Sequence, residues 1–152
     1  MSTHYKGSER EQRALNAYIT LTRATESLWE RLHKHLVEEG LTAGQFAVLE
    51  ALLHLGPLRQ HELAKKVLRS KGNMTFVIDN LEKQGLVKRE REEADRRCTS
   101  VSLTAAGKKL ISVVFPRHVE ALVKEMGALS QTEQESLRTL CRKLGKTGEE
   151  KR

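Results

Sequence analysis

The stretch that decides the fold is LEKQGLVKREREEADRRCTSVSLT, residues 81–104. It begins as the end of a helix, because Gly85 and the apolar residue after it are typical of a left-handed helix C-cap. Beyond this glycine the apolar period changes to two, over residues 86–91 and again over residues 98–103. The charged, turn-prone residues 92–97 separate the two runs. The stretch therefore predicts a helix followed directly by a β-hairpin.

Capping patterns and glycines divide the rest of the chain into helices. A Ser or Thr followed three residues later by Glu or Gln, the reciprocal capping box, begins at Ser8, Thr42 and Ser130. Pro116 lies inside one expected helix and should kink it. The expected helices cover residues 9–39, 43–54, 60–66 and 71–84 before the hairpin, and 104–126 and 130–144 after it.

Closely connected short helices followed at once by a basic hairpin predict a winged helix-turn-helix. The fold class is mainly α with a small β-hairpin wing, and a chain of 152 residues has the length of a single domain. Within residues 1–152 we assign 42–103 to the winged helix-turn-helix. We assign 9–39 and 104–145 to helices through which two copies dimerise.

The charge of the chain is concentrated in its middle third. Residues 59–109 contain 13 Lys and Arg against 7 Asp and Glu, which accounts for most of the net charge of +7. A local basic excess suits a surface that neutralises phosphates. No apolar run approaches the roughly 18 residues of a membrane span, and the first residues do not resemble a signal peptide. We therefore expect a cytoplasmic protein with no membrane partner.

The helix over residues 71–84 has two faces with different expected roles. One face is apolar and should lie in the core; it consists of Met74, Val77, Ile78 and Leu81. The other face and the first turn should meet DNA; the residues expected there are Ser70, Lys71, Asn73, Thr75, Phe76 and Lys83.

Three of these side chains have chemistry that fits base or backbone contacts. Asn73 can read adenine, and Lys71 can contact guanine or a phosphate. Phe76 lies on a face that should be wet, which suggests an apolar contact with a thymine methyl group or a sugar. The alternative for Phe76 is a ring folded against the wing. In the basic hairpin, Arg89 and Arg91 are expected to approach the DNA as well.

Three segments resemble the signature of the MarR family of bacterial regulators: residues 81–87, residues 95–97, and residues 101–104 with Gly107 shortly after. Residues 45–49 also fit the second helix of that family. The resemblance extends from about Ala14 to Leu144. It implies an obligate dimer formed by the first, fifth and sixth helices. It also implies roles in the wing: Asp95 orients it, Arg97 inserts in or beside the minor groove, and Arg96 contacts a phosphate.

The last two helices support a dimer independently of the resemblance. Their apolar residues lie outside the expected winged core, and unburied stripes of this kind need a partner. A two-fold homodimer would place its recognition helices about 34 Å apart, over successive major grooves of palindromic double-stranded DNA. These apolar residues are Leu110, Val113, Val114, Leu122, Val123, Met126, Leu137, Leu140, Cys141 and Leu144.

MarR-like proteins commonly release DNA when a phenolic or other small aromatic compound binds between the dimer helices and the winged domain. The resemblance thus implies a repressor with a small aromatic effector. Residues 115–118 and the first two helices look similar to members that respond to catechols and quinones. Ordinary core packing and exposed histidines are the alternative. The residues that can converge on such an effector are Trp29, His33, Phe46 and His118.

Other functions have weaker support. Thiol-based redox sensing would have to use Cys98, because Cys141 falls in an apolar stripe and neither thiol lies near the start of the first helix. The six histidines do not form paired zinc ligands at helical spacing, so we expect no metal and no cofactor. No Gly-rich phosphate loop or nucleophile motif indicates an enzyme. A protein-binding dimer that lacks DNA affinity stays open as an alternative.

Overall fold

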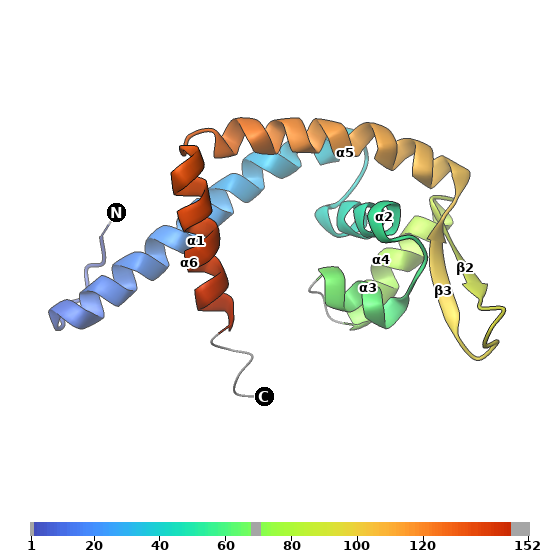
Figure 1. Cartoon of the computed structure of the whole chain (residues 1–152), viewed down its shortest axis with the longest axis horizontal. Helices are drawn as coiled ribbons and strands as arrows, with labels where there is room; N and C mark the ends of the chain where they lie inside the picture. Colours follow the sequence, from blue (N-terminus) through green and yellow to red (C-terminus); the bar gives the residue numbers. More distant parts are fainter. Residues whose placement is uncertain (1, 68–70, 147–152) are drawn as a thin grey trace. The chain divides into compact units, whose positions relative to one another are not determined.

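The computed structural model describes residues 2–67 and 71–146. The chain divides into two compact units, Met1–His118 and Val119–Arg152. Figure 1 labels the elements of both units. In chain order they are α1 (Glu9–Glu38), α2 (Ala43–Leu55), β1 (Leu58–Arg59), α3 (Gln60–Val67), α4 (Lys71–Lys83), β2 (Val87–Arg91), β3 (Thr99–Leu103), α5 (Ala105–Met126) and α6 (Gln131–Lys146).

The predicted fold class is confirmed: a mainly helical chain carries a small antiparallel sheet. Helix and strand bounds agree with the predicted ones to within two residues. The sheet differs in having a third strand, with the order β1-β3-β2. In β1, Leu58 pairs with Val101 and Arg59 with Ser100. Two residues are too few to display a period of two, so this strand depends on its partner and not on a local pattern.

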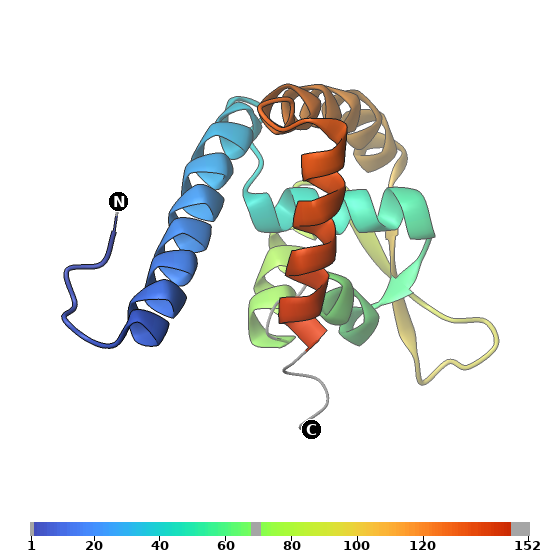
Figure 2. The ribbon, with the colours of Figure 1, turned by 60° about the vertical axis from the view of Figure 1, so that its left-hand side comes forward.

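The connection from α4 into the hairpin is a glycine turn. Gly85 has φ +71°, a conformation that costs glycine little and other residues more. The backbone N–H of Leu86 donates to the carbonyl of Leu81 at 3.0 Å, which closes the helix end. The chain then enters β2, whose five residues pair in register with β3. Figures 1 and 2 both show this hairpin, the wing, projecting beyond α3 and α4.

One apolar core joins α2, α3, α4, the sheet and the first half of α5. The predicted inward face of α4 is confirmed, since Met74, Ile78 and Leu81 are fully buried and Val77 nearly so. Each such side chain contributes on the order of 2 kcal/mol by leaving water. The core therefore holds α4 in one orientation and leaves its opposite face in solvent. The largest fully buried side chains are Leu36, Leu49, Leu63, Met74, Ile78, Leu81, Ile111, Val48, Val87, Val101 and Val114.

The second unit contains the end of α5 and all of α6. The turn between these helices is held by the side-chain amide of Gln134, which donates to the carbonyls of Met126 and Leu129 at 3.0 and 3.1 Å. No side chain of α6 is buried. Cys141, expected in an apolar stripe, is exposed in the single chain. Among the described residues, no helix is long and apolar enough to cross a membrane.

Candidate functional site

The solvent face of α4 begins with exposed polar and aromatic side chains. Asn73, Thr75 and Phe76 are exposed there, while their neighbour Met74 is buried. The side-chain amide of Gln60 donates to the hydroxyl of Thr75 and so ties the first turn of α3 to α4. Ser70 lies outside the described residues, as does the side chain of Lys71. Lys83 is exposed at the last turn.

Phe76 is 67% exposed, so its ring is in solvent and not folded against the wing. An aromatic side chain of this size, on the same helix face as Asn73 and Thr75, leaves a large apolar surface exposed among the described residues. Such a surface suits contact with a methyl group or a sugar.

Arg89 fastens the wing to α4. Its guanidinium lies 2.6 Å from a carboxylate oxygen of Asp79 and 3.1 Å from one of Glu82, and the side chain is only 24% exposed. The backbone N–H of Arg89 also donates to Glu82, at 3.2 Å. Two carboxylates on α4 and one guanidinium on β2 thus fix the wing relative to the exposed face of α4. The sequence assigned Arg89 to DNA and did not reveal this positioning role.

A second ion pair secures the far end of β2. The guanidinium of Arg59 donates to both carboxylate oxygens of Glu92, at 2.9 and 2.8 Å. This pairing holds the pKa of the Glu92 carboxyl below its ordinary value. Arg59 precedes α3, whereas Glu92 follows β2, and 33 positions separate them in sequence. No local pattern marks such a pair, which is why sequence reasoning missed it.

The tip of the wing presents arginines to solvent. Asp95 accepts from the side chain of Arg97 at 3.1 and 3.3 Å and from its backbone N–H at 3.1 Å. These bonds hold the pKa of Asp95 below its ordinary value. The side chain of Arg97 is nevertheless 91% exposed. Asp95 thus orients the guanidinium of Arg97, which stays exposed to solvent. The same end of the wing contains a hollow of about 500 Å³, which is lined by Arg91, Glu92, Glu93 and Arg96.

The four residues expected at an effector site meet where α1, α2 and α5 join. Trp29 stacks on His33, with ring centroids 3.7 Å apart. His118 of α5 lies 5.9 Å from the ring of His33 and 4.6 Å from that of Phe46. The structure adds His35, whose ring is 5.4 Å from His118. We call His33, His35 and His118 the histidine cluster.

The histidine cluster contains polar atoms without partners. Nε2 of His35 and Nδ1 of His118 are buried and form no hydrogen bond among the described residues. Burial lowers the pKa of His118, and the imidazoles of His35 and His33 lower it further. By contrast, Nδ1 of His33 lies 2.8 Å from the carbonyl oxygen of Trp29. Buried nitrogens of this kind usually have a hydrogen-bond partner in folded proteins.

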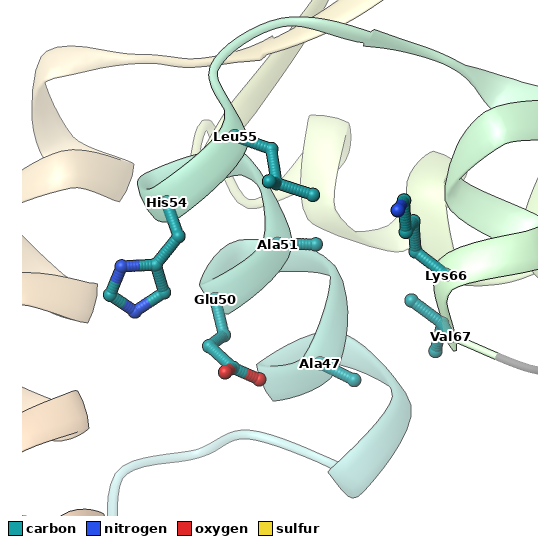
Figure 3. Close-up of a pocket in the computed structure, with 7 residues that line it drawn as sticks. All are labelled: Ala47, Glu50, Ala51, His54, Leu55, Lys66 and Val67. Atoms are coloured by element: carbon teal, nitrogen blue, oxygen red, sulfur yellow. The ribbon is translucent and has the colours of Figure 1, made fainter.

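A separate groove of about 280 Å³ lies between α2 and α3. Figure 3 shows Ala47, Ala51 and Leu55 facing Lys66 and Val67 across it, with Glu50 and His54 on another side of α2. His54 instead makes an edge contact with Phe115, at 4.6 Å between ring centroids. None of the four expected effector residues lines this groove.

Neither thiol has the surroundings of a metal or disulfide site. Cys98 is half-buried, with its sulfur 3.7 Å from a carboxylate oxygen of Asp95, and Cys141 is exposed. Within residues 2–67 and 71–146 there is no group of three or more His, Cys, Asp or Glu side chains that suits a metal ion.

Comparison with known proteins agrees with this geometry. Residues 41–99 match the model of the MarR family. The HTH-type transcriptional regulator MhqR of Bacillus subtilis is 32% identical over 134 residues, which cover 88% of this chain and 92% of MhqR.

Two solved structures are similar along nearly the whole chain. Bordetella bronchiseptica BpsR, studied for the regulation of its DNA binding by 6-hydroxynicotinic acid, is 26% identical. Its TM-score is 0.79, with 94% of this chain and 98% of BpsR covered. Streptomyces coelicolor Sco3205, a MarR family regulator solved with DNA, has a TM-score of 0.82 at 24% identity and shows the fold; the coverage is 95% and 91%. The winged helix-turn-helix and the extent of the match to MhqR lead to one conclusion: the chain belongs to the MarR family of transcriptional regulators.

Proposed function

We propose that this protein is a homodimeric repressor that binds a palindromic operator through α4 and the wing. The proposal rests on one observation: the wing is fixed to α4, and both α4 and the tip of the wing present side chains to solvent. Arg89 and its two carboxylates hold the wing to α4, while Asn73, Phe76 and Arg97 face solvent. A helix of this kind fits the major groove, and an exposed arginine on a projecting hairpin fits the adjacent backbone or minor groove.

DNA selected from random sequence by the purified protein tests this proposal. Binding should be tight to a two-fold symmetric site and should weaken steeply as salt rises, because each neutralised phosphate releases counterions. A protein-binding dimer without DNA activity would select no symmetric sequence and would show no DNA binding at low salt. That outcome would replace our proposal with the alternative.

Two substitutions should separate positioning contacts from base reading. Arg97→Ala should weaken binding to every sequence and lower the salt dependence by about one phosphate contact. Asn73→Ala should relax base choice at one symmetric pair of operator positions, at a loss of roughly 1 to 3 kcal/mol for the preferred base. Fluorescence anisotropy on single-base operator variants measures both effects. As a control, Arg10→Ala removes an equal charge from the exposed start of α1 and should change neither the affinity nor the base choice. If Arg97→Ala and Asn73→Ala both bind DNA like the wild type, the placement of α4 and the wing on DNA is wrong.

We further propose that a small aromatic compound releases the operator by binding at the histidine cluster. Trp29 is half exposed and stacks on His33, whereas Phe46 is a core residue whose ring lies 4.6 Å from that of His118. The nitrogens of His35 and His118, which form no hydrogen bond among the described residues, offer polar anchors. The likeness to BpsR supports an aromatic effector. Such a ligand acts through its differential affinity for the state that cannot bind DNA, and tenfold release requires about 1.4 kcal/mol.

A double substitution distinguishes this proposal from redox sensing by Cys98. The Cys98→Ser/Cys141→Ser protein should still release its operator when a redox-inert phenol or aromatic acid that releases the wild type is added. The reason is that neither thiol belongs to the histidine cluster. Operator release should be measured anaerobically, since quinones also alkylate thiols. If the double variant binds DNA normally but ignores the compound, the response belongs to Cys98 and the aromatic site is wrong.

A further inference from the structure

We propose that Phe76 makes operator recognition depend on the C5-methyl group of one pyrimidine in each half-site. The ring packs on that methyl group at the floor of the major groove. The inference rests on the proposed function of α4 and adds the chemical group that the helix reads. Thymine carries this methyl group, and so does cytosine methylated at C5, whereas uracil and unmodified cytosine lack it.

The position of Phe76 on α4 directs its ring away from the core. The core face of the helix consists of four buried side chains, Met74, Val77, Ile78 and Leu81. At about 100° per residue, Phe76 lies roughly 150° around the helix from the middle of that face. Its 67% exposure agrees with this placement. The ring therefore projects from the part of α4 that faces the base edges when a helix enters the major groove.

The chemistry of the ring favours a methyl group over the other groups in the groove. A phenyl ring has no hydrogen-bond donor or acceptor. Against a carbonyl or amino group of a base, it would remove that group from water and offer no bond in return. The C5-methyl group is the apolar substituent that the base edges present in the major groove. Sugars lie in the walls of the groove, whereas Phe76 projects towards its floor.

Contacts on both sides of Phe76 fix the helix that carries it. Thr75, the residue before it, accepts a hydrogen bond from the side-chain amide of Gln60 on α3. Asp79, one turn after it, accepts from the guanidinium of Arg89 on β2 at 2.6 Å. A helix held from α3 and from the wing presents the ring at one depth and in one register. The loss of a single methyl group should therefore be measurable.

Replacing single thymines of the selected operator with deoxyuridine tests the inference. Deoxyuridine keeps the base pairing and both carbonyl oxygens of thymine and removes only the methyl group. At one symmetric pair of positions, affinity should fall about fourfold when one half-site is changed and about fifteenfold when both are changed. 5-Bromodeoxyuridine should restore the affinity, because its bromine has nearly the size of a methyl group. Fluorescence anisotropy measures each affinity.

Cytosine at the same pair of positions gives a second measurement. An operator with C·G in place of T·A there should bind more weakly than the selected one, because the methyl group is lost and the polar edge changes. Methylation of that cytosine at C5 should recover part of the lost affinity, since it returns the methyl group without altering the pairing. Equal binding of the methylated and unmethylated operators contradicts the inference.

Matched substitutions assign the methyl contact to the ring of Phe76. Phe76→Ala should bind the thymine and uracil operators with equal affinity, and Phe76→Leu, which keeps an apolar side chain, should retain part of the difference. Tyr5→Ala removes another exposed aromatic ring, ahead of α1, and should discriminate like the wild type. Circular dichroism establishes that each variant is folded, as expected for changes at exposed positions.

The outcomes separate this inference from the function on which it rests. If no thymine of the operator is sensitive to loss of its methyl group, the inference is wrong and the proposed repressor stands. The same holds if Phe76→Ala still discriminates thymine from uracil, or if it weakens binding to every operator by one common factor, as a sugar contact would. If the wild-type protein selects no symmetric DNA, the proposed function is itself wrong, and the inference falls with it.

Discussion

Replacing Leu137, Leu140 and Leu144 together with glutamate should turn the protein into a monomer and abolish operator binding at nanomolar concentrations. These leucines are 37%, 65% and 64% exposed in the single chain, and they recur at the spacing of one helix face. No residue of α6 is buried among the described residues, so these leucines leave apolar surface exposed. An apolar face of this length is typical of an interface between subunits.

The size of the effect follows from the number of side chains lost. Burial of one leucine contributes about 1.5 to 3 kcal/mol, and a two-fold interface buries each of them twice. We therefore expect the dimer dissociation constant to rise at least 100-fold. DNA affinity should fall with it, because a monomer reaches only one half-site and loses the second recognition helix.

Sedimentation velocity across micromolar concentrations measures the association state. A control pair, Thr139→Glu and Arg142→Glu, adds negative charge to exposed polar positions on the same helix and should leave the dimer intact. Helix content by circular dichroism shows whether the leucine variant is folded. If it remains a dimer with wild-type DNA affinity, α6 is not the dimerisation element and this part of our proposal is wrong.

Local signals allowed most of the fold to be predicted from sequence. The capping boxes at Ser8, Thr42 and Ser130, together with Gly85, mark helix ends through bonds between residues a few positions apart. The inward face of α4 followed from a period that any single helix displays. Such features need no knowledge of the rest of the chain, which explains their agreement with the structure.

What could not be predicted depends on residues that meet only after folding. The strand β1 exists through its pairing with Val101 and Ser100. Arg59 and Glu92 are brought together by the sheet, and Arg89 reaches Asp79 and Glu82 across the glycine turn. The sequence alone does not distinguish a basic hairpin residue that contacts DNA from one that forms an ion pair within the chain.

The candidate effector site shows the same limit. Trp29 and His33 were identified through helical spacing, whereas Phe46 and His118 came from an expectation about where helices converge. His35 was missed because its spacing from His33 is not helical, and only the position of α5 brings His118 within 5.4 Å of it. The three imidazoles thus come together only when α1 packs against α5.

Gly107→Ala should destabilise the protein by about 3 kcal/mol, and the unfolding temperature should fall by roughly 6 to 12 °C for a chain of this length. A Cβ atom at Gly107 would lie 1.9 Å from the carbonyl oxygen of Leu86 and 2.9 Å from its carbonyl carbon. Both are backbone atoms, so no side-chain rotation relieves the clash. Sequence resemblance pointed to this glycine, and the close approach of α5 to the start of the wing explains it.

Gly107→Ala should also weaken DNA binding, because the contact between Gly107 and Leu86 lies beside the start of the wing. The backbone N–H of Thr104 donates to the Leu86 carbonyl at 3.1 Å, its hydroxyl donates to the carbonyl of Gly85 at 2.6 Å, and the N–H of Gly107 donates to that hydroxyl at 3.0 Å. Moving α5 away from Leu86 therefore disturbs the turn that leads from α4 into the wing. We expect operator affinity to fall even well below the unfolding temperature.

Gly145→Ala is the matched control. It makes the same chemical change in α6, where an added Cβ meets no atom within 4 Å. Because alanine favours a helix interior over glycine by up to about 1 kcal/mol, this variant should be neutral or slightly more stable. Thermal unfolding at one fixed protein concentration compares the two, since the stability of a dimer depends on concentration. Equal unfolding temperatures for Gly107→Ala and the wild type would show that the Leu86 carbonyl leaves room for a Cβ atom at position 107, which contradicts the close approach of α5 to the wing.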